Sequence, residues 1–247
     1  MTRKTLIIAN PGTTGNYLPG VLIDVMNYTR FLQSAIGGYW YANEIEALTN
    51  PDRASLTMSL TKLKNVDFSI VIFTGHGYFS EAKNDTILEL KSDVEIEASR
   101  LLTGTGKQLL ILDCCRKEEQ TAILSKSFQK FAESYQYVNP AACRAIYDRL
   151  ISNSVGPDTI TFACSIGEYS RDDAQRGGLY SYNLIGEAEK WANRSGANPY
   201  TNYSALSIVE AHDLATAEVV RLSGRRQNPD ILKARTSPYF PFAVIAR

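Results

Sequence analysis

The chain has 247 residues, 44% of them hydrophobic, which is enough for one α/β domain with a sizeable core. Lys plus Arg and Asp plus Glu both number 26, so the zero net charge gives no reason to expect a nucleic-acid or anionic membrane partner. Four cysteines without a CxxC pair, and two histidines, argue against a disulfide framework and a metal site. The first apolar run stops at Pro11, too early for a signal peptide or membrane span. We expect a cytoplasmic protein without cofactor or metal.

Short apolar runs recur along the chain with helical patterns between them. The strongest lie at 68–73 and 109–112, and the others at 6–9, 44–48 (weaker), 159–163 and 242–245. Continuous apolar runs are typical of strands buried on both faces of a parallel sheet. The sequence therefore predicts an α/β fold around a mostly parallel, six-stranded sheet flanked by helices. Helices are expected at 21–32, 179–192 and 205–222. Two more are expected after Asn50-Pro51 and Asn139-Pro140, where an N-cap asparagine precedes a proline in the first turn.

Two stretches interrupt this alternation. Residues 86–96 predict a small hairpin inserted after the strand at 68–73. Residues 116–157 are polar and helical, with no strong strand pattern. We interpret the chain as a single domain, 1–247, in which 116–157 connects a larger part, 1–115, to a smaller part, 158–247.

Reactive side chains follow the two strongest strands directly. His76 stands between Gly75 and Gly77 after the first, and Cys115 follows Asp113 after the second. In open α/β sheets, ligand sites collect at the carboxyl ends of the strands. If the two strands are neighbours, His76 can take the proton of the Cys115 thiol, and the amides of Gly77 and Cys115 can donate to an oxyanion. No third catalytic residue is evident.

These segments resemble the caspase-like cysteine peptidases, and among them the metacaspases and their prokaryotic relatives. That family has Gly-His-Gly after one strand and Asp-x-Cys after the next, which makes Cys115, rather than Cys114, the nucleophile. The resemblance covers nearly the whole chain, through the segments 18–25, 162–165, 177–182 and 227–229. It implies a caspase-like three-layer sandwich, with 1–115 similar to the large subunit and 158–247 to the small subunit.

The resemblance also implies a preference for Arg or Lys before the cleaved bond. By motif position, Asp24 and Asp113 correspond to the acidic residues of the metacaspase specificity pocket, and Thr74 to a further pocket position. Two carboxylates at one strand edge suit a guanidinium, which binds carboxylates through paired hydrogen bonds. The chain departs from metacaspases after the nucleophile, where Arg116-Lys117-Glu118 replaces His-Ser-Gly. Calcium activation is therefore not carried over.

Several alternatives stay open at this point. His76 and Cys115 could be a turn histidine and a buried thiol, Asp24 could serve only its helix dipole, and Asp113 could cap a loop. The chain could be a catalytically silent homologue that acts as a scaffold, or a nucleotide-binding domain, although it has no phosphate-binding glycine motif. As a peptidase it would act on proteins or peptides. It would be switched by a protein partner in a stress or defence response, or by self-cleavage after a basic residue of the connector: Arg116, Lys117, Lys126, Lys130, Arg144 or Arg149.

Overall fold

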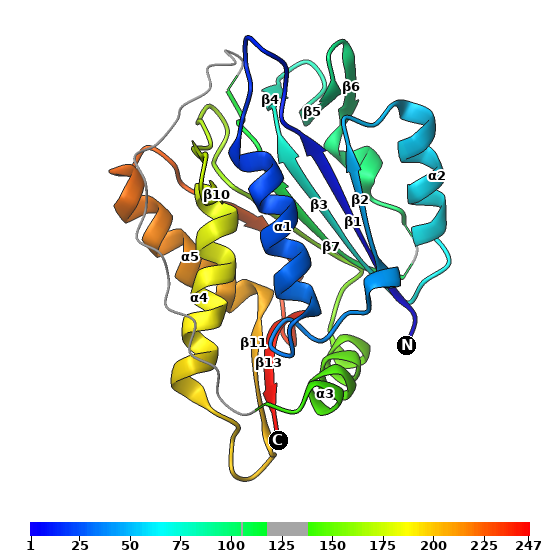
Figure 1. Ribbon diagram of the computed structural model, residues 1–247, viewed down its shortest axis with the longest axis vertical. Coiled ribbons are helices and arrows are strands. Elements are labelled where there is room, and N and C mark those ends of the chain that lie inside the picture. Colours follow the sequence, from blue (N-terminus) through cyan, green and yellow to red (C-terminus); the bar gives the residue numbers. More distant parts are fainter. Residues whose placement is uncertain (105, 118–137) are drawn as a thin grey trace.

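A mixed six-stranded sheet forms the centre of the computed structural model, which describes residues 1–104, 106–117 and 138–247 (Figure 1). The strand order is β12-β8-β7-β3-β1-β2, and only β12 at one edge runs antiparallel to its neighbour. The strands of this sheet are β1 (Arg3–Asn10), β2 (Ile45–Thr49), β3 (Phe68–Gly75), β7 (Lys107–Asp113), β8 (Asp158–Phe162) and β12 (Asp230–Leu232). The expected six-stranded, mostly parallel sheet is confirmed.

Two apolar cores, one on each face, make the molecule a three-layer sandwich. One core packs the sheet against four helices, α1 (Gly20–Gln33), α3 (Pro140–Asn153), α4 (Leu179–Ser195) and α5 (Ile208–Ser223). The other core packs it against α2 (Arg53–Leu63), the short helix η2 (Ala98–Leu101) and a small antiparallel sheet of β4 (Gly77–Ser80), β5 (Asp85–Lys91) and β6 (Val94–Glu97). The β5–β6 pair confirms the hairpin expected at 86–96. Within the described ranges, no helix is long and apolar enough to cross a membrane.

Two expected elements differ in the structure. The apolar run at 242–245 forms β13 (Pro241–Ala246), but it pairs antiparallel with β11 (Tyr203–Ser207) in a separate sheet, and β12 supplies the sixth central strand. The helix expected to begin at residue 205 begins at Ile208. Ser207 and Glu210 form a capping box there, which satisfies the first amides of α5.

The two Asn-Pro pairs have different roles. Asn139 caps α3 by accepting a hydrogen bond from the Ala142 amide, with Pro140 in the first turn, as predicted. The cap of α2 is Asp52, which accepts from the Ser55 amide at 2.8 Å, and Asn50 lies in a left-handed turn before it. The prediction at Asn50-Pro51 was therefore wrong by two residues. Within the connector 116–157, residues 118–137 lie outside the described ranges, and they include the cleavage candidates Lys126 and Lys130.

Charged side chains bind α3 to the start of the sheet. The buried Arg3 guanidinium donates to Asp148 at 2.9 Å and to the Gly38 carbonyl at 2.6 Å, and it lies over the Trp40 ring. The Lys107 ammonium donates to three carbonyl groups at the carboxyl end of α3, at distances of 2.7–2.9 Å. These bonds hold α3 against the end of the sheet opposite to the edge where the reactive residues lie.

Candidate active site

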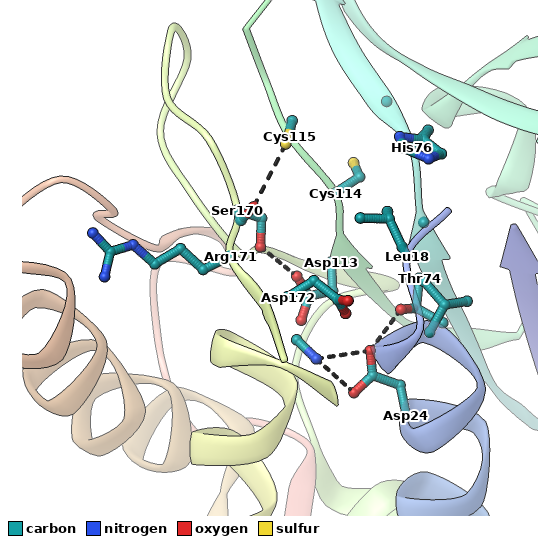
Figure 2. Close-up of a pocket in the computed structure, with 14 residues that line it drawn as sticks. Leu18, Asp24, Thr74, His76, Asp113, Cys114, Cys115, Ser170, Arg171 and Asp172 are labelled. Atoms are coloured by element: carbon teal, nitrogen blue, oxygen red, sulfur yellow. Dashed lines mark hydrogen bonds between the residues drawn. The ribbon is translucent and has the colours of Figure 1, made fainter. Parts of the chain in front are cut away.

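The carboxyl ends of the parallel strands β1, β3, β7 and β8 all lie at the same end of the sheet. Thr74 of β3 lies beside Asp113 of β7 in the strand register, which makes the two reactive strands direct neighbours. His76 and Cys115 follow these two residues, and both line one pocket, shown in Figure 2. The two strands that precede His76 and Cys115 are therefore neighbours, which the sequence analysis had to assume.

The imidazole of His76 is held by a main-chain carbonyl group. His76 Nε2 lies 2.6 Å from the oxygen of Asn16, in the loop between β1 and α1. A carbonyl oxygen only accepts, so this contact assigns the proton of the neutral ring to Nε2 and leaves the lone pair on Nδ1. Nδ1 is therefore the atom that can act as a base. Asn16 is the orienting partner that the sequence did not reveal, since it contributes a main-chain atom with no side-chain signal.

The loop that carries Asn16 is shaped by its own hydrogen bonds. The Asn16 amide donates to Thr13 O at 3.0 Å, and the Asn16 side chain accepts from the Thr13 amide at 2.8 Å. Gly12 has a positive φ of 79°, and a β-carbon placed there would lie 2.7 Å from His76 Nε2. The glycine thus gives the loop its turn and leaves room for the imidazole.

The Cys115 thiol is partly buried and points away from His76 in Figure 2. Its sulfur donates to the carbonyl oxygen of Ser170 at 3.6 Å. Burial raises the pKa of this thiol to about 11, so it is neutral at pH 7. In the part of the chain that the structure describes, no hydrogen bond joins Cys115 to His76. The two groups line one pocket, and catalytic hydrogen bonds often tighten only when substrate binds.

Gly77 begins β4 and lies opposite Leu88 of β5. The preceding pair is hydrogen-bonded, since the Glu89 amide donates to His76 O at 3.1 Å. Antiparallel pairs alternate between bonded and non-bonded positions, so the Gly77 N–H points away from β5. This orientation, together with its place in the pocket lining, fits an amide donor to a developing oxyanion.

Asp24 and Asp113 lie buried at the base of the pocket. Asp24 Oδ2 accepts from the Thr74 hydroxyl at 2.6 Å, and both of its oxygens accept from the Gly178 amide. Asp113 accepts from the Ser170 hydroxyl at 2.6 Å and from the Ser181 hydroxyl at 2.6 Å. Burial raises the pKa of both carboxyls, and for Asp24 the charge of Asp113 raises it further. All donors to this pair in the described ranges are uncharged.

A third carboxyl, Asp172 in β9 (Asp172–Asp173), lines the same pocket. Its Oδ2 accepts from the Gly20 amide at 3.0 Å, and burial raises its pKa to about 6, with smaller contributions from Asp113 and Asp173. Asp172 was not predicted from the sequence, although its place before the glycine pair was a usable signal. Ser170, which contacts both Cys115 and Asp113, was missed as well.

Two consecutive glycines, which form β10 (Gly177–Gly178), make the wall between the carboxyls. A β-carbon on Gly177 would lie 2.0 Å from Asp24 Oδ1, and one on Gly178 would lie 2.3 Å from Asp113 Oδ2. Any side chain here would occupy the space beside the acids. The cavity that remains has a volume of about 30 Å³, which admits water but not an arginine side chain. The pocket must therefore open to accept a side chain.

A mostly parallel sheet with helices on both faces, and with histidine and cysteine just after the ends of two neighbouring strands, defines a three-layer α/β sandwich with a thiol and an imidazole lining one pocket. A model of the caspase domain matches residues 2–240, and the chain belongs to this family of cysteine peptidases, whose substrates are proteins. Among solved structures, the chain is similar to caspase-1 from Spodoptera frugiperda. The TM-score is 0.60 at 12% identity, over 94% of this chain and 86% of the other, which supports the fold. No curated protein sequence matches the chain.

Proposed function

We propose that this chain is a cysteine endopeptidase that cleaves after Arg or Lys, with Cys115 as nucleophile and His76 as general base. The observation that carries the proposal is the pair of buried carboxyls, Asp24 and Asp113, beside the thiol and the imidazole. Two buried acids whose donors among the described residues are all uncharged favour a cation, and an arginine or lysine side chain supplies one. Thr74 orients Asp24 for that contact.

The proposed catalytic sequence begins with a rotation of the Cys115 side chain. The Cys115 sulfur turns from Ser170 O, His76 Nδ1 takes its proton, and the thiolate attacks the carbonyl carbon of the basic residue. The Gly77 amide stabilises the oxyanion, and the imidazolium returns the proton to the leaving amine. Water then attacks the thioester while His76 accepts its proton. The imidazolium returns that proton to the departing Cys115 sulfur, which releases the acid and the free thiol. The Asn16 carbonyl keeps the ring oriented throughout.

Activation is the second part of the proposal, because the resting pocket is closed and the thiol is neutral. We infer that a protein partner, acting in a cytoplasmic stress or defence response, or self-cleavage in the connector opens the site. Arg116 is 6% exposed and held by Thr86, so it is a poor cleavage site. Arg144 and Arg149 lie inside α3, where a helix resists entry into a peptidase site.

The test is hydrolysis of fluorogenic peptides that end in Arg, Lys or Asp. We expect cleavage after Arg and Lys, lost on the order of 10⁴-fold in Cys115→Ala, and Asp24→Asn to lower kcat/KM for both by about 100-fold. Preference for Asp would overturn the acidic pocket. A catalytically silent homologue, the alternative favoured by the separated thiol and imidazole, would cleave none of the three even after partner proteins are added.

A further inference from the structure

The side chain of Gln227 is fully buried and uses both ends of its amide. Its Nε2 donates to Ala163 O at 2.9 Å and to the Ser170 hydroxyl at 3.3 Å. Its Oε1 accepts from the Arg171 amide at 3.2 Å. One side chain thus links the residue that follows β8 with the segment Ser170–Arg171, which passes beside the nucleophile.

The backbone of Gln227 is fixed independently by the end of α5. The Gln227 amide donates to the Ser223 hydroxyl at 3.1 Å, and that hydroxyl also donates to Gln227 O at 3.4 Å. Ala163 is fixed in turn, because its amide donates to Leu112 O of β7 at 2.9 Å. Gln227 therefore bridges two anchored points, and the segment Ser170–Arg171 is held between them.

Ser170 connects this bridge to both functional parts of the pocket. Its carbonyl oxygen accepts from the Cys115 thiol, and its hydroxyl donates to Asp113 at 2.6 Å while accepting from Gln227. A shift of Ser170 would therefore move the acceptor of the thiol and the donor of the acidic pocket together. Figure 2 shows Ser170 between Cys115 and Asp113.

We propose that Gln227 is a positioning residue that fixes Ser170, and through it both the Cys115 thiol and the Asp113 carboxyl. The peptidase part of this proposal rests on the proposed function, whereas the placement of the thiol does not. Without the side-chain amide of Gln227, the Ala163 carbonyl and the Arg171 main-chain amide lose a buried hydrogen-bond partner. The segment Ser170–Arg171 then loosens toward solvent. A looser segment exposes the sulfur and lowers its pKa toward the ordinary value.

Gln227→Met is the principal variant, since methionine has a similar length and cannot donate or accept in the same way. Gln227→Glu is the second variant: it keeps an acceptor for the Arg171 amide and loses both donors, and its added negative charge opposes a fall in the thiol pKa. The control is Gln108→Met. Gln108 is another buried glutamine with both amide ends bonded, to Leu101 and Thr103, at the opposite end of the strand that leads to Cys115.

The first measurement is the rate at which iodoacetamide alkylates Cys115, followed by peptide mass spectrometry between pH 6 and 10. We expect Gln227→Met to raise this rate at pH 8 by about tenfold, through a thiol pKa about one unit lower, and Gln227→Glu to raise it less. Gln108→Met should leave the alkylation rate of Cys115 unchanged, even where it lowers thermal stability as much as Gln227→Met does. Wild-type rates and pH profiles in both folded Gln227 variants would overturn the proposal. If Gln227→Met does not fold, a wild-type rate and pH profile in Gln227→Glu alone would overturn it.

The second measurement is cleavage of the basic peptide. We expect a rise in KM of about tenfold in Gln227→Met, because Asp113 loses its fixed Ser170 donor and keeps only the Ser181 bonds, with a smaller change in kcat. A change in kcat alone would contradict the link to Asp113. If wild type cleaves no peptide even after partner proteins are added, the proposed function fails, whereas the alkylation rates still decide the placement of the thiol.

Discussion

Replacing Asp172 by asparagine should change how the stability of the protein depends on pH. Burial raises the pKa of this carboxyl from its ordinary value of 3.8 to about 6. Between these two values the folded chain binds more protons than the unfolded chain, so the free energy of unfolding falls as the pH rises. One pKa unit corresponds to about 1.4 kcal/mol, so the whole shift costs the wild type about 3 kcal/mol by neutral pH.

Asp172→Asn removes the titration, and its side-chain oxygen can still accept from the Gly20 amide. Relative to wild type, we therefore expect the variant to gain about 3 kcal/mol in unfolding free energy between pH 4 and pH 7. Urea denaturation at half-unit pH steps measures this difference. Parallel stability profiles for the two proteins would refute the reasoning, since they would show that the buried carboxyl ionises without cost.

The exposed Asp67 gives a control of opposite sign. The amide and hydroxyl of Thr2 donate to its carboxylate and lower its pKa. Its stabilising contribution is present above the ordinary pKa and is lost as the pH falls through the lowered value. Asp67→Asn should therefore lose stability near neutral pH and match wild type in strong acid, which the same urea series would show.

Two further predictions concern packing. Gly178→Ala should fold but lose cleavage of basic peptides by about 100-fold or more in kcat/KM, because the new carbon would lie 2.3 Å from Asp113 Oδ2. Gly15→Ala, which meets no atom within 4 Å, is its control, and equal activity of the two would contradict the tight wall. Arg3→Met should lower the unfolding free energy by about 2–3 kcal/mol, since it removes the charged hydrogen bonds of Arg3 to Asp148 and to the buried Gly38 carbonyl, and urea denaturation would test this.

Much of the central sheet could be predicted, because its strands are buried on both faces and therefore apolar throughout. The runs at 68–73 and 109–112 became β3 and β7, and the placement of His76 and Cys115 followed from their ends. The run at 242–245 has the same apolar character, yet it belongs to another sheet. Periodicity reports burial but not the neighbouring strand, so this assignment required tertiary information.

The sequence contains a pattern that marks the start of α5, and the prediction missed it. Ser207 and Glu210 have the spacing of a capping box, which places the helix start after residue 207. The Asn16 carbonyl is different, since any residue has one and no side-chain pattern marks it. The positions of Asp24, Thr74 and Asp113 in one pocket could be expected from the family resemblance, whereas their catalytic and specificity roles stay predictions.

The contacts of α3 and of β8 hold the part of the chain after residue 137 against the part before residue 118 without using the backbone that connects them. The pairing of β8 with β7, the Arg3–Asp148 ion pair and the Lys107 bonds all join residues on opposite sides of the interval 118–137. None of these bonds depends on the peptide backbone within that interval. A chain cut there would give two polypeptides on a denaturing gel that still elute as one particle under native conditions. After such a cut, the sheet that carries both His76 and Cys115 would stay assembled.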